Sequence, residues 1–121
     1  MEHKHLPHTH THTHEAEKLA GQLGHMEDFE VVSQVFKQLS DTSRVRIFWL
    51  LCHCEECVMN ISALVDMSSP AVSHHLRQLK SSGLIVSRRE GKEVYYKASD
   101  SEASKLLHST IEEILAITCP K

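Results

Sequence analysis

Three cysteines and a histidine fall within six positions, in the stretch L-C-H-C-E-E-C-V-M-N that begins at Leu51. The cysteines are Cys52, Cys54 and Cys57, in a chain that contains four cysteines in all. Thiolates at C-x-C-x-x-C spacing suit Zn²⁺, Cd²⁺ or another soft metal ion. The same thiols could form a redox pair, and free cysteines are also common as small buried core residues. The spacing alone leaves these three interpretations open.

A second group of possible ligands lies at the N-terminus, where residues 1–14 hold six of the eleven histidines. Four of them alternate with threonine in H-T-H-T-H-T-H, and such a composition cannot form a packed core. We therefore expect a mobile His-rich arm over residues 1–14 and a single domain over residues 15–121. Because imidazole is largely neutral at pH 7, His10, His12 and His14 could complete a metal site begun by the cysteines.

Two other function classes use the same residues. Cys57 near a helix N-terminus could react as a thiolate with peroxide or reactive sulfur, with Cys119 as a possible partner. A metal-buffering protein would instead rely on the His-rich arm. Enzyme function is not predicted, because the sequence has no Ser-His-Asp order, phosphate loop or glycine-rich motif.

Length and composition further limit the possible classes of protein. The 121 residues suffice for one domain, and 40% of them are hydrophobic. No run of about 18 apolar residues exists, so no membrane span is predicted. The N-terminus has no apolar segment of the kind found in secretory signals. We therefore expect a cytoplasmic protein, in which thiols stay reduced and clustered cysteines favour metal or redox chemistry.

Charge is unevenly distributed along the chain. The formal net charge is -3, which by itself argues against a nucleic-acid partner. Residues 70–97, however, carry six basic and two acidic side chains, whereas the remainder carries seven basic and fourteen acidic ones. A basic segment within an acidic protein is a candidate surface for nucleic acid.

Helices are expected on both sides of the cysteine segment, residues 52–57. A first helix starts near Ala16 and covers Phe29 to Leu39, where apolar residues recur at three- and four-residue steps. Asp41 is a good N-cap for a second helix, which we expect to end near Cys54. A short third helix is predicted over about Ser62 to Met67.

The C-terminal half has clear start and stop signals. Ser68-Ser69-Pro70 predicts a fourth helix that runs from Pro70 to about Ser82 and ends at Gly83. The segments L-I-V-S-R-R, E-G-K-E and V-Y-Y-K-A are typical of a strand, a turn and a strand. S-D-S-E at positions 99–102 is a capping box for a last helix that extends to about Thr118. The predicted fold class is mostly α with a small β-hairpin wing (α+β), a winged helix-turn-helix.

This order of elements suggests double-stranded DNA as a partner. A short helix, a tight turn and a second amphipathic helix form a helix-turn-helix, whose second helix can enter the major groove. Val72, Leu76 and Leu79 would face the core. The side chains predicted to contact DNA are Ser69, Ser73, His74, Arg77, Gln78 and Lys80 on the helix, and Arg88, Arg89 and Lys92 near the hairpin tip.

The run S-S-P-A-V-S-H-H-L-R-Q-L-K-S-S-G-L-I-V-S-R-R-E-G-K-E-V-Y-Y resembles the signature of the ArsR/SmtB family of bacterial repressors. L-S-D-T-S-R-V-R-I resembles the opening of that family's second helix, so the resemblance covers about Val35 to Asp100. It implies a homodimer paired mainly through the first and last helices. It also implies binding to an operator with two-fold character, and release from DNA when an inducer binds.

The resemblance also bears on the inducer. The family's thiolate metal sensors carry a Cys-Val-Cys block, which falls here on Cys57, Val58 and Met59, so that Met59 replaces the second thiolate. Cys52 and Cys54 lie just upstream and could compensate for it. The prediction is a repressor that leaves its operator when zinc or another soft or borderline divalent ion, such as cadmium, binds as inducer.

A second metal site of the family straddles the last helices of the dimer. The matching positions here are Asp100, Glu102, Glu113 and Ala116, so both imidazoles of the family pattern are absent. His108 and Glu112 do share a helix face at i, i+4 spacing, as a pair of metal ligands could. Asp100, Glu102, His108, Glu112 and Glu113 are therefore additional candidate ligands.

Overall fold

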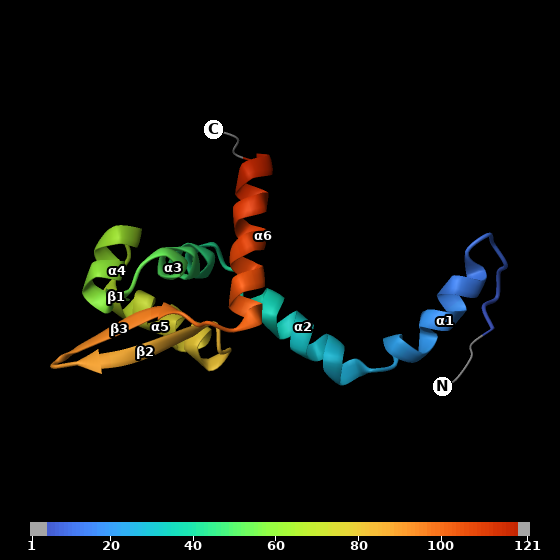
Figure 1. The fold of residues 1–121 in the computed structure, drawn as a ribbon, viewed down its shortest axis with the longest axis horizontal. Coiled ribbons are helices and arrows are strands. Elements are labelled where there is room, and N and C mark those ends of the chain that lie inside the picture. Colours follow the sequence, from blue (N-terminus) through green and yellow to red (C-terminus); the bar gives the residue numbers. More distant parts are fainter. Residues whose placement is uncertain (1–4, 119–121) are drawn as a thin grey trace. The chain divides into compact units, whose positions relative to one another are not determined.

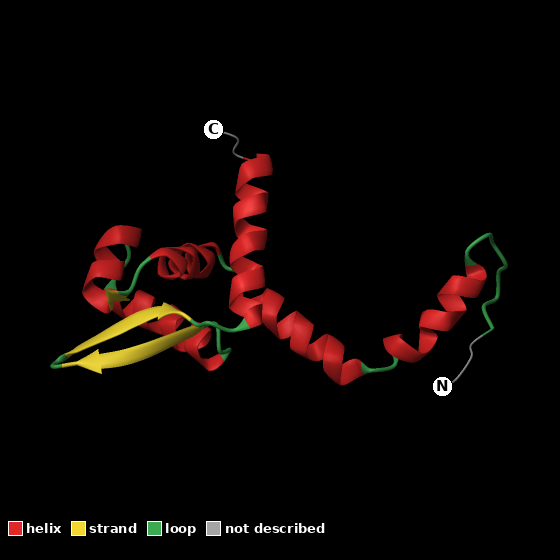
Figure 2. Ribbon diagram, viewed as in Figure 1, coloured by secondary structure: helices red, strands yellow, loops and turns green. Residues whose placement is uncertain are grey.

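The computed structural model describes residues 5–118, and Figures 1 and 2 show their helices and strands. Contacts divide the chain into two compact units with the boundary between Gln34 and Val35, and each unit is described here by itself. The first unit contains α1 (Thr13–Leu23) and the beginning of α2 (Met26–Gln38). One continuous helix was not found there, because Gly24, a poor helix former, separates α1 from α2. α1 begins inside residues 1–14, and the division of the chain into an arm and a domain stays a prediction.

The second unit has the element order of a winged helix-turn-helix, which confirms the predicted fold class. Its elements after α2 are α3 (Thr42–His53), β1 (Glu56–Cys57), α4 (Val58–Val65), α5 (Ser69–Ser81), β2 (Ile85–Glu90), β3 (Glu93–Ala98) and α6 (Glu102–Thr118). α4 and α5 form the helix-turn-helix, and β2 and β3 form the wing (Figure 1). The predicted end of the second helix near Cys54 is also confirmed, since Cys54 is the extended C-cap of α3.

Two of the predicted helix starts use the expected capping side chains. The Asp41 carboxylate accepts a hydrogen bond from the Arg44 backbone N–H at 2.9 Å at the start of α3. The Ser68 hydroxyl accepts one from the Ala71 backbone N–H at 3.3 Å at the start of α5, with Pro in its first turn. These caps satisfy backbone donors that the helices themselves cannot pair.

The start of α6 differs in detail from the predicted capping box. The capping acceptor is the hydroxyl of Ser101, which accepts from the Ser104 backbone N–H at 3.2 Å. Ser99 is not the cap because its hydroxyl donates instead to the Gly83 carbonyl oxygen at 2.8 Å. The Ser104 hydroxyl is buried and donates to the Leu84 carbonyl oxygen at 2.8 Å, which fixes the first turn of α6 against the segment after α5.

The short helix of the helix-turn-helix was placed too late by the sequence prediction. α4 starts at Val58 and ends at Val65, whereas the predicted range was about Ser62 to Met67. Asp66 ends the helix in the left-handed conformation, with φ of 58°. The helix begins early because Cys57, its N-cap, is already held in extended backbone as part of strand β1.

The sheet has one more strand than the predicted hairpin. β1 pairs with β3 on the side away from β2, so the strand order is β1-β3-β2 and both pairings are antiparallel. Cys57 lies opposite Tyr95 in this sheet. Gly91 forms the turn between β2 and β3 with φ of 63°, a conformation that is costly for residues with a Cβ atom.

One hydrophobic core holds the second unit together. Its fully buried members come from α3, α4, α5 and the start of the wing, and are Ile47, Phe48, Leu51, Ile61, Val65, Val72, Leu76, Leu79, Leu84 and Ile85. The predicted inward face of α5 is therefore confirmed at Val72, Leu76 and Leu79. From α6, Leu107 and Ile111 pack against this core.

Candidate DNA-binding face and metal centre

Helix α5 presents a polar face opposite its buried one. We call this the α5 face; its residues are Ser69, Ser73, His74, Arg77, Gln78 and Lys80. Ser69, His74, Arg77 and Lys80 are exposed, and Ser73 and Gln78 are half-buried. Hydroxyl, amide and guanidinium groups can bond to base edges, and ammonium and guanidinium groups can bond to phosphates. The α5 face therefore has the side chains that reading a major groove requires.

The two adjacent histidines of α5 have different surroundings. His74 is exposed, whereas the side chain of His75 is only 12% exposed and faces the start of α3. Its Nε2 lies 3.9 Å from Asp41 Oδ1. Burial lowers the pKa of His75, although the nearby Asp41 carboxylate opposes this shift. His75 thus belongs to the packing of α5 against α3, and only His74 belongs to the α5 face.

The wing carries basic side chains in two different states. Arg88 binds Glu55 through Nε at 3.0 Å and Nη2 at 2.8 Å, and binds Glu90 through Nη1 at 2.7 Å. Its guanidinium also lies 4.9 Å from the centre of the Tyr95 ring. Arg89 and Lys92 are exposed, and neither makes an ion pair with any residue in the range 5–118. Arg89 and Lys92 are thus available for phosphates, whereas Arg88 is occupied by two carboxylates.

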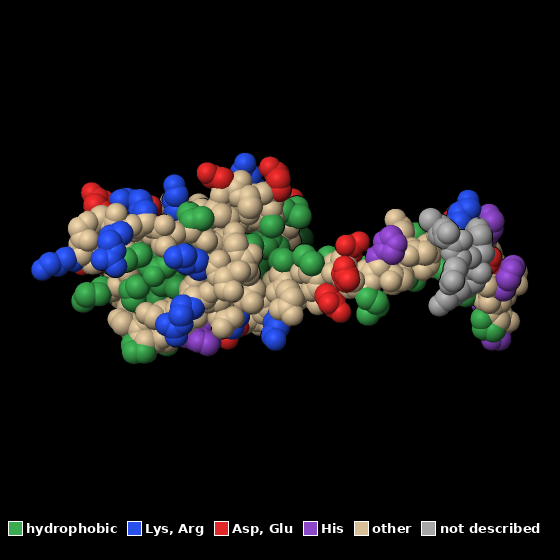
Figure 3. All heavy atoms as spheres, turned by 90° about the horizontal axis from the view of Figure 1, so that it is seen from below, with side chains coloured by type: hydrophobic (Ala, Val, Ile, Leu, Met, Phe, Trp, Pro, Cys, Tyr) green, Lys and Arg blue, Asp and Glu red, His purple; other side chains and the backbone are tan. Residues whose placement is uncertain are grey.

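Basic side chains gather over the wing and α5, as Figure 3 shows at the end of the molecule that carries the β2–β3 turn. Lys80 joins these two elements, because its Nζ donates to the Ser87 hydroxyl on β2 at 2.7 Å. The predicted basic segment is therefore one surface in the fold, formed by the α5 face and the wing.

The three cysteines lie between the last turn of α3 and strand β1. Cys52 is in the last turn of α3 and packs against the core, Cys54 follows as the exposed C-cap, and Cys57 is in β1. All three are free thiols. Burial, together with the Glu112 carboxylate, raises the pKa of Cys52 to about 11, and burial also raises the pKa of Cys54. Neither Cys52 nor Cys54 therefore has the depressed pKa of a reactive thiolate.

The cysteines do not meet as a set of three ligands among residues 5–118. Cys52 and Cys54 do line the same hollow of about 370 Å³, together with His53, Asp100 and His108. Cys57 is not part of its lining. The predicted site of Cys52, Cys54 and Cys57 stays a prediction, and binding there requires the cysteine segment to rearrange.

The other predicted ligands are dispersed. His12 and His14 are exposed at the start of α1, His10 precedes them, and His12 Nδ1 lies 3.6 Å from Glu15. Glu102 and Glu113 are exposed on α6 and belong to no three-ligand group within the described range. Cys119 lies outside the described residues.

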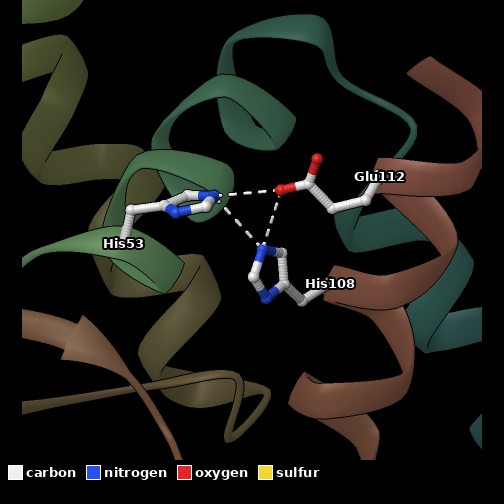
Figure 4. A group of neighbouring side chains, drawn as sticks. All are labelled: His53, His108 and Glu112. Carbon is white, nitrogen blue, oxygen red and sulfur yellow. Dashed lines mark hydrogen bonds and ion pairs between the residues drawn. The ribbon is translucent and has the colours of Figure 1, made fainter. Parts of the chain in front are cut away.

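One group within residues 5–118 does bring three potential ligand atoms together, all within 4.8 Å of one another. We call it the histidine–glutamate cluster; it consists of His53 at the end of α3 and His108 and Glu112 on α6 (Figure 4). His53 Nε2 and His108 Nε2 lie 3.0 Å and 3.1 Å from the same oxygen, Glu112 Oε1. The two ring nitrogens are 3.2 Å apart.

Trp49 completes the surroundings of the cluster. Its indole Nε1 donates to Glu112 Oε1 at 3.2 Å, and its ring centre lies 4.6 Å from that of His53. Partial desolvation would raise the pKa of Glu112, but hydrogen bonds from His108, His53 and Trp49 hold that pKa below its ordinary value. Glu112 is therefore a carboxylate at neutral pH, ready to accept bonds.

The predicted i, i+4 pair of His108 and Glu112 is thus present in the fold, whereas His53 was not among the predicted ligands. Its sequence signal was weak, because a single histidine beside cysteines on α3 does not indicate which helix it faces. The contact with Glu112 spans 59 positions of sequence and exists only after α6 packs on α3.

None of the helices among residues 5–118 is both long and apolar enough to cross a bilayer.

Comparisons with known proteins agree with the winged helix-turn-helix fold. The sequence model of the family described as "Bacterial regulatory protein, arsR family" matches residues 41–87, which run from the cap of α3 into β2. The chain is 39% identical over 93 residues to the cadmium resistance transcriptional regulatory protein CadC of Listeria innocua, a match covering 74% of this chain and 78% of that protein. It is 42% identical over 77 residues to a CadC homologue of Staphylococcus aureus, covering 63% of this chain and 64% of that protein.

A solved structure is also similar. It is the solution structure of a homodimeric winged helix-turn-helix DNA-binding domain from Mycobacterium bovis, described as a possible ArsR-family transcriptional regulator. The TM-score is 0.67 at 28% sequence identity, and the match covers 79% of this chain and 87% of that one.

Proposed function

The chain belongs to the ArsR/SmtB family of bacterial transcriptional regulators, and from this premise we propose that it is a metal-responsive repressor. As a member of a family of DNA-binding regulators, it is not an enzyme. In the proposed mechanism a homodimer binds an operator with two-fold character in the cytoplasm. It leaves this operator when a soft or borderline ion of the Zn²⁺ or Cd²⁺ type binds. The observation that carries the proposal is the single surface formed by the α5 face and the wing.

The proposed DNA contacts follow from this surface. α5 would lie in the major groove, so that Arg77 and Gln78 reach base edges while the helix start at Ser69 and Ser73 approaches the backbone. Arg89 and Lys92 would bind phosphates beside the groove. Arg88 was predicted to do the same, but its bonds to two carboxylates favour a role in holding the wing. Each protomer would supply one such set, which suits an operator of two half-sites.

Exposed apolar side chains support the homodimer. On α6, Leu106 is 67% exposed and Ile117 is 77% exposed, and on α2 Phe36 is 65% exposed. Large apolar side chains that cluster on a surface commonly mark an interface with another protein. A second copy of this chain is the proposed occupant, as the resemblance to a homodimeric domain also suggests.

The proposed inducer rests on the cysteines and on the relatives. The relatives named above regulate cadmium resistance, and thiolates prefer soft ions such as Cd²⁺. The proposed ligands are Cys52, Cys54 and Cys57, with His10, His12 or His14 from the His-rich arm completing the site. Because the three sulfur atoms do not converge in the structure, metal binding would have to reshape residues 52–57. That change can release DNA only if the ion binds the DNA-free conformation more tightly.

Fluorescence anisotropy with a labelled operator fragment tests the repressor function. Arg77→Ala is expected to weaken specific binding by about 1–3 kcal/mol if Arg77 contacts a base. The matched control is Lys18→Ala, which removes one positive charge from exposed α1, far from α5 in sequence. Equal affinity of Arg77→Ala and Lys18→Ala for operator and for random duplex would contradict the proposed α5 face.

Titration of the protein–operator complex with Zn²⁺, Cd²⁺ or a persulfide donor tests the inducer. Metal is expected to release DNA from the wild-type protein but not from Cys57→Ser, and Cd²⁺ binding should give a thiolate charge-transfer absorption band. The redox alternative, which depends on Cys57, has less support, because the relatives named above regulate cadmium resistance. Release by the persulfide donor with no response to metal would reverse this preference.

A further inference from the structure

We propose that His53, His108 and Glu112 form a second metal site, separate from the cysteines, which binds a borderline divalent ion such as Zn²⁺ and ties α6 to α3. The proposal goes beyond the function given above, because it concerns another donor set on other elements. The donors are two imidazole nitrogens and one carboxylate oxygen, and they come from two helices that are distant in sequence (Figure 4).

The distances within the cluster match the shape of a coordination site. The three donor atoms form a triangle with sides of 3.0, 3.1 and 3.2 Å. A tetrahedral zinc ion with ligand bonds of about 2.0–2.1 Å has neighbouring ligand atoms roughly 3.3–3.4 Å apart. The triangle is therefore within a few tenths of an ångström of one face of such a tetrahedron, and a small outward shift would admit the ion.

Hydrogen bonding alone does not satisfy this triangle well. If both Nε2 atoms carry hydrogens and donate to Glu112 Oε1, no hydrogen is left for the contact between His53 and His108. If one ring carries its hydrogen on Nδ1 instead, its Nε2 lone pair faces the carboxylate oxygen. A cation at the centre would remove the conflict, because all three atoms would then direct lone pairs at it.

The surroundings of Glu112 add support from a fourth residue. The indole N–H of Trp49 donates to the same oxygen that both histidines approach. Hydrogen bonds from outside the ligand set orient metal-binding carboxylates and are a usual feature of such sites. Trp49 does not bind metal itself, so its role here is to position the Glu112 carboxylate.

The donor set and its exposure define what would bind. Nitrogen and oxygen donors suit borderline ions such as Zn²⁺, Co²⁺ and Ni²⁺, whereas the cysteines suit softer ions such as Cd²⁺. The side chains of His53 and Glu112 are each 45% exposed and that of His108 is 30% exposed, so an ion can reach the cluster from solvent. Three protein ligands would leave a fourth position for water.

The position of the cluster gives the site a structural consequence. α3 begins next to its N-cap Asp41, which lies beside His75 of α5, and ends at His53 in the cluster. α6 carries the apolar residues proposed to pair with a second copy. An ion held between His53 and the two ligands on α6 would fix the last helix relative to the helix that supports α5. Zinc binding would therefore stiffen the connection between the proposed dimer contact and the α5 face.

The experiment uses full-length reduced protein and two signals. Trp49 is the only tryptophan of the chain, and it lies next to the cluster, so its fluorescence reports binding there. Co²⁺ added to the protein distinguishes the two donor sets, because cysteine ligands give a strong charge-transfer band that nitrogen and oxygen ligands lack. We expect one Co²⁺ per chain to quench Trp49 without that band, and Zn²⁺ to displace it.

Ligand variants then locate the ion. His53→Ala and His108→Ala are each expected to weaken Zn²⁺ binding at least tenfold, as measured by Trp49 emission. The control His25→Ala, which replaces an exposed histidine outside the cluster, should leave Zn²⁺ binding unchanged. Circular dichroism checks that each variant is folded. If a variant does not fold, Glu112→Gln replaces it, since the amide can keep the hydrogen bond from Trp49.

The outcomes separate this site from the proposed inducer site. Unchanged Zn²⁺ affinity in His53→Ala and His108→Ala would overturn the proposal. A charge-transfer band with the first equivalent of Co²⁺, together with no quenching of Trp49 by further Co²⁺ in Cys57→Ser, would also overturn it, because the ion would then bind only at the cysteines. Loss of the Trp49 response in His108→Ala, with Cd²⁺ release of DNA retained, would support two independent sites.

Discussion

The ion pairs of Arg88 lead to a prediction about how the wing binds DNA. Arg88 is held by Glu55 and Glu90, whereas Arg89, the next residue, has no carboxylate partner within the described range. If this arrangement persists in the complex, Arg88 adds no counterion release on binding and Arg89 does. The test compares Arg89→Ala with the double variant Glu55→Ala, Arg88→Ala. The double variant removes one charge of each sign, so the net charge of the wing region is unchanged.

The expected size of the effect follows from counterion release. Each phosphate contact contributes about 0.9 to the slope of log K against log salt concentration on B-DNA. In a dimer with one Arg89 contact per protomer, Arg89→Ala would reduce the magnitude of this slope by about 1.8. Between 50 mM and 200 mM salt, the wild-type affinity should then fall roughly tenfold further than that of Arg89→Ala. The double variant should keep the wild-type slope.

The assay is fluorescence anisotropy with operator and random duplexes at four or more salt concentrations. Circular dichroism should show both proteins folded, because exposed ion pairs contribute little to stability. The reasoning is refuted if the double variant flattens the salt dependence as much as Arg89→Ala does. That result would mean that the Arg88 pairs open on DNA and that Arg88 binds phosphate, as the sequence predicted.

Three further predictions concern stability and thiol chemistry. Asp41→Ala should lower the free energy of unfolding by about 1 kcal/mol at pH 7, measured by urea denaturation, whereas Asp41→Asn should keep most of the cap. Because the pKa of Asp41 is lowered on folding, its charge stabilises the folded protein above the unfolded pKa near 3.8, and this stabilisation is lost as pH falls through the lower folded pKa. The free energies of unfolding of the wild type and of Asp41→Asn should therefore converge in acid. Leu76→Ala should cost roughly 2–5 kcal/mol in the same measurement, since Leu76 is 2% exposed in the core; a loss below 1 kcal/mol would contradict the packing. Cys52, with its pKa of about 11, should be alkylated by iodoacetamide much more slowly than exposed Cys54 at pH 8, as followed by mass spectrometry of peptides; equal rates would argue against its burial.

Local sequence signals determined most of the elements in the second unit. The caps at Asp41 and Ser68 act between residues three positions apart, and the glycine turn of the wing joins neighbouring strands. The buried face of α5 follows from helical periodicity. These features need no knowledge of distant residues, so the winged helix-turn-helix could be derived from the sequence and the family resemblance, whereas the DNA contacts of α5 stay a prediction.

Other features depended on contacts between segments far apart in the chain. The pairing of β1 with β3 joins residues around Cys57 and Tyr95, and it moved the start of α4 forward. The bond between Arg88 and Glu55 spans 33 positions and changes which wing residue is available for phosphate. The residues around one member of such a pair do not indicate the other member, because strand pairs and ion pairs form across the folded sheet.

The histidine–glutamate cluster illustrates the same division most clearly. Sequence spacing placed His108 and Glu112 on one helix face, because i, i+4 neighbours lie together in any α-helix. It could not add His53, because that contact requires the packing angle and register of α6 against α3. The sequence thus identifies the side chains that can bind metal, and the tertiary packing determines which of them lie together in one site.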